Sequence, residues 1–388
     1  MKKLVVVIAL LLLSACGFEA TETYKLTLSG AEAVPLNGSE LTTKAKVKLD
    51  ENRKKLRAKL FVEDIEGFKF AHIHSGGIGQ TGGVEFTFET PKKHKWKHGE
   101  RRYLEVREDK LNYAQIEALL AGDWYINVHT DAVPSGEIRA QIVPKTTTII
   151  SFKVNGRQQV PAVMTDANGE GYLAYNSDAE TLNMRVNTQG IESAMAAHIH
   201  EGRVGNNGGV LVALNQDAED ANVWTAPTDT SLSKETFSNM LSGAYYTNFH
   251  TPAHQGGEIR GQVFSSDYSL YAFPMSGSQE VPPVTTDAFG DGYALLNNSN
   301  GYVELSVLTH GVDDAVAAHI HQGVSGSNGG VVVGLEQSVD NDSVWMTPTG
   351  TMLDLSQQEA FQTGGHYVNV HTPAVGSGEI RGQIVAQE

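Results

Sequence analysis

The sequence predicts an all-β protein made of three tandem, Greek-key-like β-sandwich domains, each with one short helix, behind an N-terminal lipoprotein signal. Three observations support this class. Many segments alternate apolar and polar residues, which is typical of half-buried strands. Glycine is abundant, at 40 of 388 residues, and charged residues make up only 19%, as in a globular β protein. One set of short phrases also occurs three times, at a spacing that suits whole domains.

The N-terminus has the pattern of a bacterial lipoprotein signal. A basic start, Lys2-Lys3, precedes an apolar stretch over residues 4–13 that is too short to span a membrane. The following Leu-Ser-Ala-Cys16 resembles a lipobox, and Cys16 is the single cysteine of the chain. We therefore expect residues 1–15 to be a signal peptide, Cys16 to be the lipidation site and residues 16–23 to be a lipidated tether. An ordinary cleaved signal peptide is the alternative.

Charge and cysteine content restrict the compartment and the partners. The formal charge of −16 argues against binding to nucleic acid or to an anionic membrane, so we expect membrane contact through the lipid anchor only. Gly17 is not an inner-membrane retention signal of the aspartate type, which favours the outer membrane or cell surface of a bacterial envelope. A lipidated Cys16 leaves no thiol for a disulfide or a thiolate metal site, so core packing must stabilise the domains. The sequence names no protein or surface partner.

The strands are expected in the same order in each domain. The predicted domains are residues 24–145, 146–266 and 267–388. Each opens with an alternating strand, at Tyr24, Thr148 and Tyr268, and each strand leads through a turn to a Val-Pro pair. A second strand follows, such as Gly171-Tyr-Leu-Ala-Tyr in domain two.

One short helix per domain is expected just before the strand that carries a late histidine. In domain one, Asn112 and Gln115 form a capping-box pattern, and Gly122 is the stop. Ser233 precedes the apolar stripe of domain two, and Ser356 to Glu359 is the capping box predicted in domain three. The stripe of each helix is expected to pack on the core.

Domain one also has a basic run, Lys92 to Lys97, followed by Arg101 and Arg102, where the other domains are acidic or neutral. Such runs are usually solvated loops. We expect a solvated loop here, and interaction with anionic glycans or lipid headgroups is the alternative.

Nine of the fourteen histidines occupy equivalent places in the three domains. A His-x-His pair runs into a glycine-rich loop, and a single later histidine lies in an Asn-x-His-Thr phrase. The nine are His72, His74, His129, His198, His200, His250, His319, His321 and His371. Residues i and i+2 of a strand point to the same face, so each pair lies side by side, and the late histidine joins it if the two strands are neighbours. Three neutral imidazoles suit copper or zinc and leave an open coordination position.

A Gly-Glu-Ile-Arg phrase is expected to pair back on the late-histidine strand as a hairpin. Its Glu and Arg, with the Asn two positions before the late histidine, would then orient the imidazoles. These supporting residues are Asn127, Glu137, Arg139, Asn248, Glu258, Arg260, Asn369, Glu379 and Arg381. The alternative is a polar network of His, Asn, Glu and Arg that pins the glycine-rich loop without any metal.

Other chemistries fit the sequence less well. The glycine-rich loops lead into valine-rich strands and not into helices, so they are not dinucleotide or phosphate cradles. The sequence has no Ser-His-Asp order, His-Glu-x-x-His motif or paired-carboxylate constellation, which disfavours a hydrolase. An enzyme is therefore less expected than a binding protein.

Together the repeated phrases resemble the CHRD domain, a module named for chordin that also occurs in bacterial secreted proteins. The matching phrases are Ala-His-Ile-His-x-Gly, Asn-x-His-Thr and Gly-Glu-Ile-Arg-Gly-Gln, and only Ala140 of domain one departs from the glycine. The resemblance implies three all-β domains over nearly all of the mature chain and little defined biochemistry.

A weaker resemblance is to Cu/Zn superoxide dismutases, which also have a His-x-His strand, a late copper-binding histidine and a downstream arginine near the metal. In domain two these would match His198, His200, His250 and Arg260, but a bridging histidine, zinc-loop ligands and disulfide cysteines are not visible. The leading hypothesis is a lipid-anchored envelope protein with three binding modules for copper or zinc. A superoxide-dismutase-like copper enzyme and a metal-free structural or adhesive surface protein are the alternatives.

Overall fold

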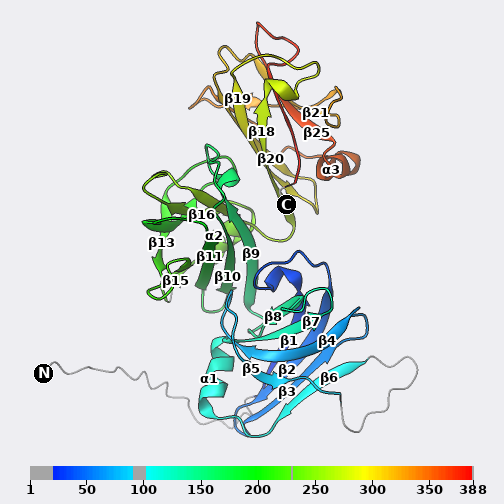
Figure 1. The fold of residues 1–388 in the computed structure, drawn as a ribbon, viewed down its shortest axis with the longest axis vertical. Helices are drawn as coiled ribbons and strands as arrows, with labels where there is room; N and C mark the ends of the chain where they lie inside the picture. The colour runs from blue at the N-terminus through cyan, green and yellow to red at the C-terminus, as the bar shows by residue number, and fades with distance from the viewer. Residues whose placement is uncertain (1–20, 91–101, 229, 387–388) are drawn as a thin grey trace, which may run out of the picture.

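Three β domains follow one another along the long axis of the molecule (Figure 1). The computed structural model describes residues 21–90, 102–228 and 230–386. Within these ranges each domain has its own antiparallel sheet and one α-helix. The all-β class and the three tandem domains expected from the sequence are therefore confirmed.

The first domain has eight strands in its described part. Its elements are β1 (Thr21–Ser29), η1 (Gly30–Glu32), β2 (Thr42–Asp50), β3 (Lys55–Phe61), β4 (Phe68–Ser75), β5 (Val84–Thr87), β6 (Tyr103–Glu108), α1 (Tyr113–Ala121), β7 (Trp124–Thr130) and β8 (Ile138–Gln141). The strands lie in the order β5-β4-β7-β8-β1-β2-β3-β6. Because β1 begins at Thr21, the last three residues of the predicted tether belong to a strand.

The second and third domains repeat this plan. The second contains β9 (Thr147–Asn155), η2 (Gly156–Gln158), β10 (Asn168–Asn176), β11 (Thr181–Gln189), β12 (Ala196–Glu201), β13 (Val210–Gln216), β14 (Val223–Thr225), β15 (Thr230–Ser231), α2 (Lys234–Leu241), β16 (Tyr245–His250) and β17 (Ile259–Val263). The third contains β18 (Tyr268–Ser276), η3 (Gly277–Gln279), β19 (Phe289–Asn297), β20 (Val303–His310), β21 (Ala317–Gln322), β22 (Val331–Gly334), β23 (Glu336–Gln337), β24 (Val344–Met346), α3 (Leu355–Gln362), β25 (His366–His371) and β26 (Ile380–Gln383).

Each sheet curls into one barrel-like layer and does not split into two separate sheets. In domain two, the strand order β10-β9-β17-β16-β12-β13-β14-β11 closes on itself because β10 also pairs with β11. A bridge between Glu89 and Glu105 joins the two ends of the order in domain one. The predicted two-layer sandwich therefore becomes a single curved sheet around one core. Alternation in the sequence does not separate these forms, since both bury one face of every strand.

One hydrophobic core fills each domain. In β2 the alternation places Ala45, Val47 and Leu49 in the core, while the three lysines between and before them face outward. In β16 Phe249 is fully buried in the core and its neighbours Asn248 and His250 point to the other face, as expected.

The helix caps agree with the sequence in two domains and differ in the third. The side chains of Asn112 and Gln115 form the predicted capping box of α1, and Ser233 accepts a hydrogen bond from Thr236 N at the start of α2. In α3 the capping residue is Asp354, which accepts from Gln357 N, and not Ser356. The hydroxyl of Ser356 instead donates to Asp354. The helix therefore begins two residues earlier than predicted, with an acidic N-cap that accepts from a free N–H and complements the helix dipole.

Some predicted features lie outside the described residues. These are the signal peptide, Cys16 and the basic run from Lys92 to Lys97. Among the helices that the structure describes, none is long and apolar enough to cross a membrane.

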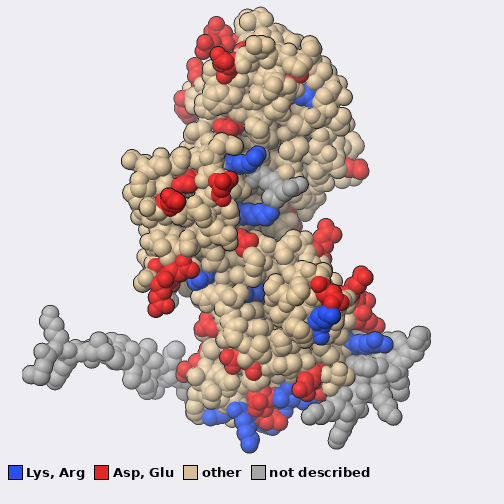
Figure 2. Space-filling model, in the orientation of Figure 1, with Lys and Arg blue, Asp and Glu red and all other residues tan. Residues whose placement is uncertain are grey.

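The domains meet through equivalent tyrosines. Tyr172 of β10 donates from its hydroxyl to Ala33 O of domain one at 3.0 Å, and Tyr293 of β19 donates to Gln159 O of domain two. Figure 2 shows that charge is unevenly distributed over the resulting column: on the face drawn, most lysine and arginine side chains lie over its lower part and the uppermost part is mainly acidic.

Candidate metal centre

The two histidine phrases of each domain lie on neighbouring strands. The His-x-His strands β4, β12 and β21 pair in antiparallel fashion with the late-histidine strands β7, β16 and β25. In domain two, His198 lies opposite Asn248, and Ala196 lies opposite His250. The late histidine is therefore a diagonal neighbour of the first histidine on the same face of the sheet. Ile199, between the pair, points into the core.

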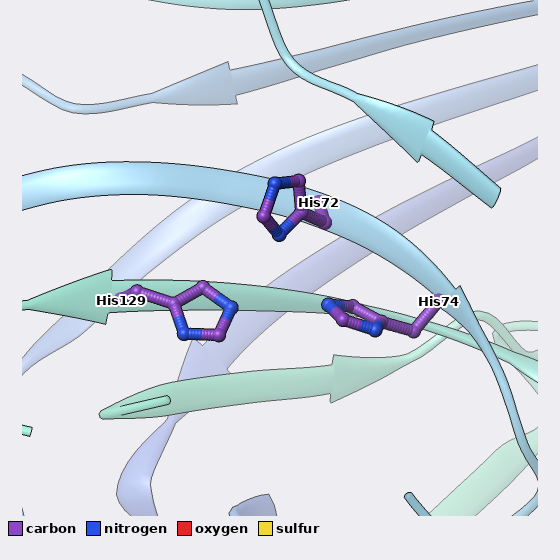
Figure 3. Close-up of side chains that lie close together, drawn as sticks. All are labelled: His72, His74 and His129. Carbon is purple, nitrogen blue, oxygen red and sulfur yellow. The ribbon is translucent and has the colours of Figure 1, made fainter. Parts of the chain in front are cut away.

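Three imidazoles converge in every domain. In domain one the ring centroid of His72 lies 5.3 Å from that of His74 and 5.3 Å from that of His129 (Figure 3). The corresponding rings of His198 and His250 are 5.1 Å apart, and those of His319 and His371 are 4.9 Å apart. In each group one ring nitrogen per histidine lies within 4.8 Å of the others. The structure thus brings together all nine predicted histidines as three equivalent triads.

Backbone carbonyls orient two rings of each triad. Nδ1 of His200 lies 3.0 Å from Gly208 O in the glycine-rich loop, and Nδ1 of His250 lies 2.9 Å from Gln255 O in the turn after β16. The same contacts are His74 to Gly82, His129 to Pro134, His321 to Gly329 and His371 to Gly376. A carbonyl oxygen only accepts, so Nδ1 carries the proton of the neutral ring and Nε2 keeps a free lone pair.

Six of the nine inward nitrogens are buried and lack a hydrogen-bond partner among the described residues, whereas Nε2 of His129 lies 3.4 Å from Nδ2 of Asn127. In domain two Nδ1 of His198 and Nε2 of both His200 and His250 have no hydrogen-bond partner. The same holds for Nδ1 of His72, Nε2 of His74 and Nε2 of His321. In domain three Nδ1 of His319 and Nε2 of His371 lie 3.0 Å apart and share one proton between them. Such orphaned nitrogens are uncommon in folded proteins unless something else binds them.

Burial favours the neutral form of the His-x-His imidazoles. Desolvation lowers the pKa of His198 and His200 below the ordinary value of 6.5, and the neighbouring histidines lower it further. The same causes lower the pKa of His72, His74, His319 and His321. A neutral imidazole is the form that binds a metal ion, so the lowered pKa favours metal binding over protonation.

The predicted arginines act on the loop rather than directly on the rings. Arg260 is 1% exposed and donates to the loop carbonyls of Asn206 at 3.0 Å and Arg203 at 3.1 Å. Its guanidinium also lies 3.5 Å from the ring centroid of Tyr246, and that ring stacks on His200 at 5.1 Å. Arg139 and Arg381 make the equivalent stacks on Tyr125 and Tyr367. Burial lowers the pKa of Arg260 to about 10, which leaves it charged at neutral pH.

The predicted Glu and Asn residues hold the turn that follows the late histidine. The carboxylate of Glu258 accepts from the hydroxyls of Thr251 at 2.8 Å and Thr165 at 2.9 Å. Asn248 donates to Gly256 O at 2.9 Å in the same turn. Glu137 and Glu379 accept from Thr130 and Thr286 in domains one and three. Asn127 and Asn369 donate to Ser135 O and Ser377 O.

Sequence reasoning missed the tyrosine of each site. Tyr246 lies directly opposite His200 in the sheet, and its hydroxyl accepts from Gly208 N at 3.2 Å. It therefore links the ring, the arginine and the glycine-rich loop. The signal was available, because a tyrosine occurs four positions before the late histidine in all three domains.

The donor set matches the coordination that copper and zinc prefer. A bond of about 2.1 Å to each nitrogen requires the three nitrogens to lie roughly 3–4 Å apart, and at present they lie within 4.8 Å of one another. Three imidazoles without thiolate or carboxylate favour Cu(II) or Zn(II) over calcium or magnesium.

Comparison with known proteins identifies the repeated unit. Residues 24–142, 150–263 and 271–384 match the family model of the CHRD domain. Chordin of Xenopus laevis is 25% identical over 307 residues, which cover 74% of this chain and 32% of that protein. The chain therefore spans about a third of the length of this relative. No solved structure matches the chain.

Proposed function

Because the chain belongs to the CHRD-domain family, we propose that it is a lipid-anchored protein of the bacterial envelope with three binding modules, each of which holds one copper or zinc ion. The observation that carries the proposal is the triad of converging ring nitrogens, which recurs in all three domains. Six of these nitrogens are buried and have no hydrogen-bond partner among the described residues. A cation bound in each domain would satisfy the unpaired nitrogens of that domain.

A metal-free hydrogen-bond network accounts less well for the same residues. Such a network should satisfy its buried polar atoms, because each unsatisfied one costs about 1–3 kcal/mol. The outer nitrogens of His200 and His250 are satisfied, by Gly208 O and Gln255 O, whereas their inner nitrogens are not. This division favours rings whose Nδ1 is held by a backbone carbonyl and whose Nε2 binds a ligand.

Redox catalysis is the second candidate, and one observation favours it. A cavity of about 150 Å³ adjoins the triad of domain one and is lined by His74, His129, Asn127 and Arg139, among others. A small molecule in this cavity would lie beside an open coordination position. A copper-loaded enzyme would consume superoxide faster than the zinc-loaded protein, whereas a binding module would show no difference.

Metal analysis tests the main proposal. Protein loaded with excess Zn(II) and desalted should retain about three equivalents per chain, one for each triad. His250→Gln should remove about one equivalent, and replacing His129, His250 and His371 together should remove nearly all. His254→Gln is the matched control, because His254 lies in the same turn outside the triad. A metal content at background in the wild type would contradict the metal proposal and leave the hydrogen-bond network as the explanation.

The anchor is tested separately. Cys16→Ser should release the protein from the membrane fraction or block its processing, because Cys16 alone satisfies the lipobox. Immunoblots of membrane and soluble fractions measure this. Unchanged fractionation and processing of the variant would contradict the lipoprotein proposal without affecting the metal proposal.

A further inference from the structure

One sheet face of the first domain is unusually basic. It is formed by the outward side chains of β1, β2, β3 and β6, and we call it the lysine face. Its cationic residues are Lys25, Lys44, Lys46, Lys48, Lys55, Arg57, Lys59 and Arg107, and its anionic residues are Asp50, Glu105 and, directly after β6, Asp109. Alternate residues of the same strands, such as Val47 and Ala58, fill the core. The lysine face therefore lies on the outside of the barrel.

Like charges lie directly opposite one another across these strands. Lys46 of β2 pairs with Lys25 of β1 on one side and with Lys59 of β3 on the other. Lys48 of β2 likewise lies directly opposite Arg57 of β3. Direct like-charge pairs destabilise a sheet, so the stability of the fold does not explain this arrangement.

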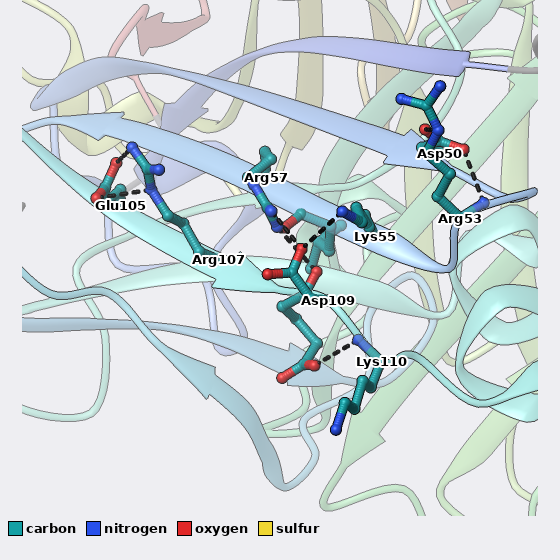
Figure 4. Close-up of polar contacts among 10 residues, drawn as sticks. Asp50, Arg53, Lys55, Arg57, Glu105, Arg107, Asp109 and Lys110 are labelled. Carbon is teal, nitrogen blue, oxygen red and sulfur yellow. Dashed lines mark hydrogen bonds and ion pairs between the residues drawn. The ribbon is translucent and has the colours of Figure 1, made fainter.

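The acidic residues on the lysine face neutralise the arginines and leave five lysines without ion pairs. Figure 4 shows Asp109 beside Arg57 and Lys55, and Glu105 beside Arg107. Among the residues that the structure describes, five lysines of this face form no ion pair: Lys25, Lys44, Lys46, Lys48 and Lys59. Their charge is available to a partner.

The other two domains use the same face for a different purpose. In domain two Tyr172 packs on Gly79 of the preceding domain, and Glu170 accepts from Leu36 N at 3.0 Å. Asp291 and Tyr293 make the equivalent contacts in domain three. Lys44 and Lys46 occupy these two positions in domain one. Lysines offer neither the carboxylate nor the flat ring that receives a neighbouring loop, so the lysine face is built for a different partner.

Charge also changes sign along the column of domains. Residues 24–145 contain 20 Lys and Arg against 17 Asp and Glu, whereas residues 267–388 contain 1 against 14. The net charge of −16 therefore resides mainly in the third domain, which lies at the other end of the molecule (Figure 1). An anionic surface would attract the first domain and repel the third. The long axis of the molecule would then point away from that surface.

We propose that the lysine face of the first domain binds anionic lipid headgroups of the membrane that carries the protein. Cys16 precedes Thr21 of β1 by five residues, which span at most about 18 Å. If Cys16 is acylated as proposed above, the first strand cannot leave the neighbourhood of the headgroups. A basic surface beside a lipid anchor adds electrostatic attraction to anionic headgroups. This proposal replaces the expectation from net charge alone that the membrane is contacted through the anchor only.

Vesicle binding without the acyl group tests the proposal independently of the anchor. The chain from residue 17 retains every core residue, because the hydrophobic clusters lie between Tyr24 and Ile384. It should sediment with vesicles that contain 30% phosphatidylglycerol at low salt and not with pure phosphatidylcholine vesicles. Binding should fall when salt is raised to 0.5 M, because salt screens exposed charges.

A triple variant separates the lysine face from general charge. Lys44→Gln, Lys46→Gln and Lys48→Gln together should weaken vesicle binding roughly 100-fold, about fivefold for each lysine. The control changes three exposed lysines elsewhere, Lys145→Gln, Lys153→Gln and Lys234→Gln, and should leave binding nearly unchanged. Retained zinc stoichiometry and melting temperature show that both variants fold.

Three results would overturn the proposal. These are equal binding to both vesicle types, undiminished binding of the triple variant, and binding to an anionic polysaccharide without binding to vesicles. None of them bears on the histidine triads. Loss of metal binding with intact vesicle binding would, conversely, contradict only the proposed metal function.

Discussion

The residue before the Val-Pro pair distinguishes the three otherwise equivalent sites. It is Ala33 in domain one, Gln159 in domain two and Glu280 in domain three. Gln159 donates to Oδ1 of Asn248 at 2.5 Å, whereas Glu280 accepts from Nδ2 of Asn369 at 3.1 Å. Oε1 of Glu280 and Oδ1 of Asn369 are left without partners. A glutamine would complete this pair, because its amide has both a donor and an acceptor.

Glu280→Gln is expected to stabilise the third domain in a pH-dependent way. Burial raises the pKa of Glu280 from 4.5 to about 7 in the folded protein. The unfolded chain releases this proton near pH 4.5, so the stability that protonated Glu280 supplies is lost as pH rises from about 4.5 to 7. The variant should therefore match the wild type near pH 4.5 and exceed it by about 1–3 kcal/mol at pH 8.

Calorimetry of the third-domain unfolding transition at pH 4.5, 6 and 8 measures this difference. Gln159→Glu is the matched control, because it introduces the same carboxyl into domain two. It should lower the stability of that domain increasingly above pH 4.5. A difference between Glu280→Gln and wild type that does not change with pH would contradict the prediction.

At the scale of elements, one stack connects the sheet to the glycine-rich loop of each site. In domain two it runs from His200 through Tyr246 to Arg260. Arg260 binds loop carbonyls, and the same loop supplies Gly208 O to His200. The loop has no regular structure of its own, so the arginine determines where the carbonyl lies. The position of an imidazole ring thus depends on a residue that does not touch it.

Arg260→Lys is expected to weaken zinc binding in domain two alone. Lysine is a compact charge that cannot both stack flat on Tyr246 and donate to Arg203 O and Asn206 O. The loosened ring should lower the zinc affinity of this site about 10–100-fold. Competition with a chelator should then resolve two tight sites and one weak site.

Arg185→Lys serves as the control for that experiment. Arg185 lies on β11 of the same domain and donates to Asn187 away from the triad. Its replacement should leave three equal sites. Equal loss of affinity in both variants would mean that Arg260 affects only general stability.

Sequence patterns predicted the elements and the triads well because both depend on local periodicity. Alternation placed Ile199 inward and His198 and His200 outward, and the strand pairing then brought His250 beside them. The closure of the sheet was not predicted, because it depends on contacts such as β10 with β11 that no local pattern encodes. The carbonyl partners of the rings were missed for a similar reason, since any residue type supplies a carbonyl oxygen.

At the scale of the whole molecule, the sites of the first two domains adjoin the domain that follows. The glycine-rich loop of domain two carries Val204 and Gly205, which pack against Tyr293, and Val204 is buried in a small cluster with Leu295. Arg203 of the same loop pairs with Glu304 at 2.6 Å. The loop that supports a triad is thus also the surface that docks the following domain. A displacement of the domain junction should therefore change the geometry of the triad, and a displacement of the triad should change the junction.

Tyr293→Ala is expected to separate the second and third domains and loosen the triad between them. It removes the hydrogen bond to Gln159 O and the ring that packs on Gly205, and deletion of a buried aromatic side chain costs about 3–5 kcal/mol. Small-angle scattering should show a larger radius of gyration, because the junction opens while both cores stay intact. Zinc affinity should fall in domain two and stay unchanged in domain three, because Tyr293 contacts the glycine-rich loop of domain two. Tyr113→Ala, at a tyrosine that is 70% exposed in domain one, should change neither quantity.

An unchanged radius of gyration for Tyr293→Ala would show that the junction does not depend on this residue. An unchanged zinc affinity in a molecule whose junction has opened would show that the triads bind metal independently of how the domains are arranged.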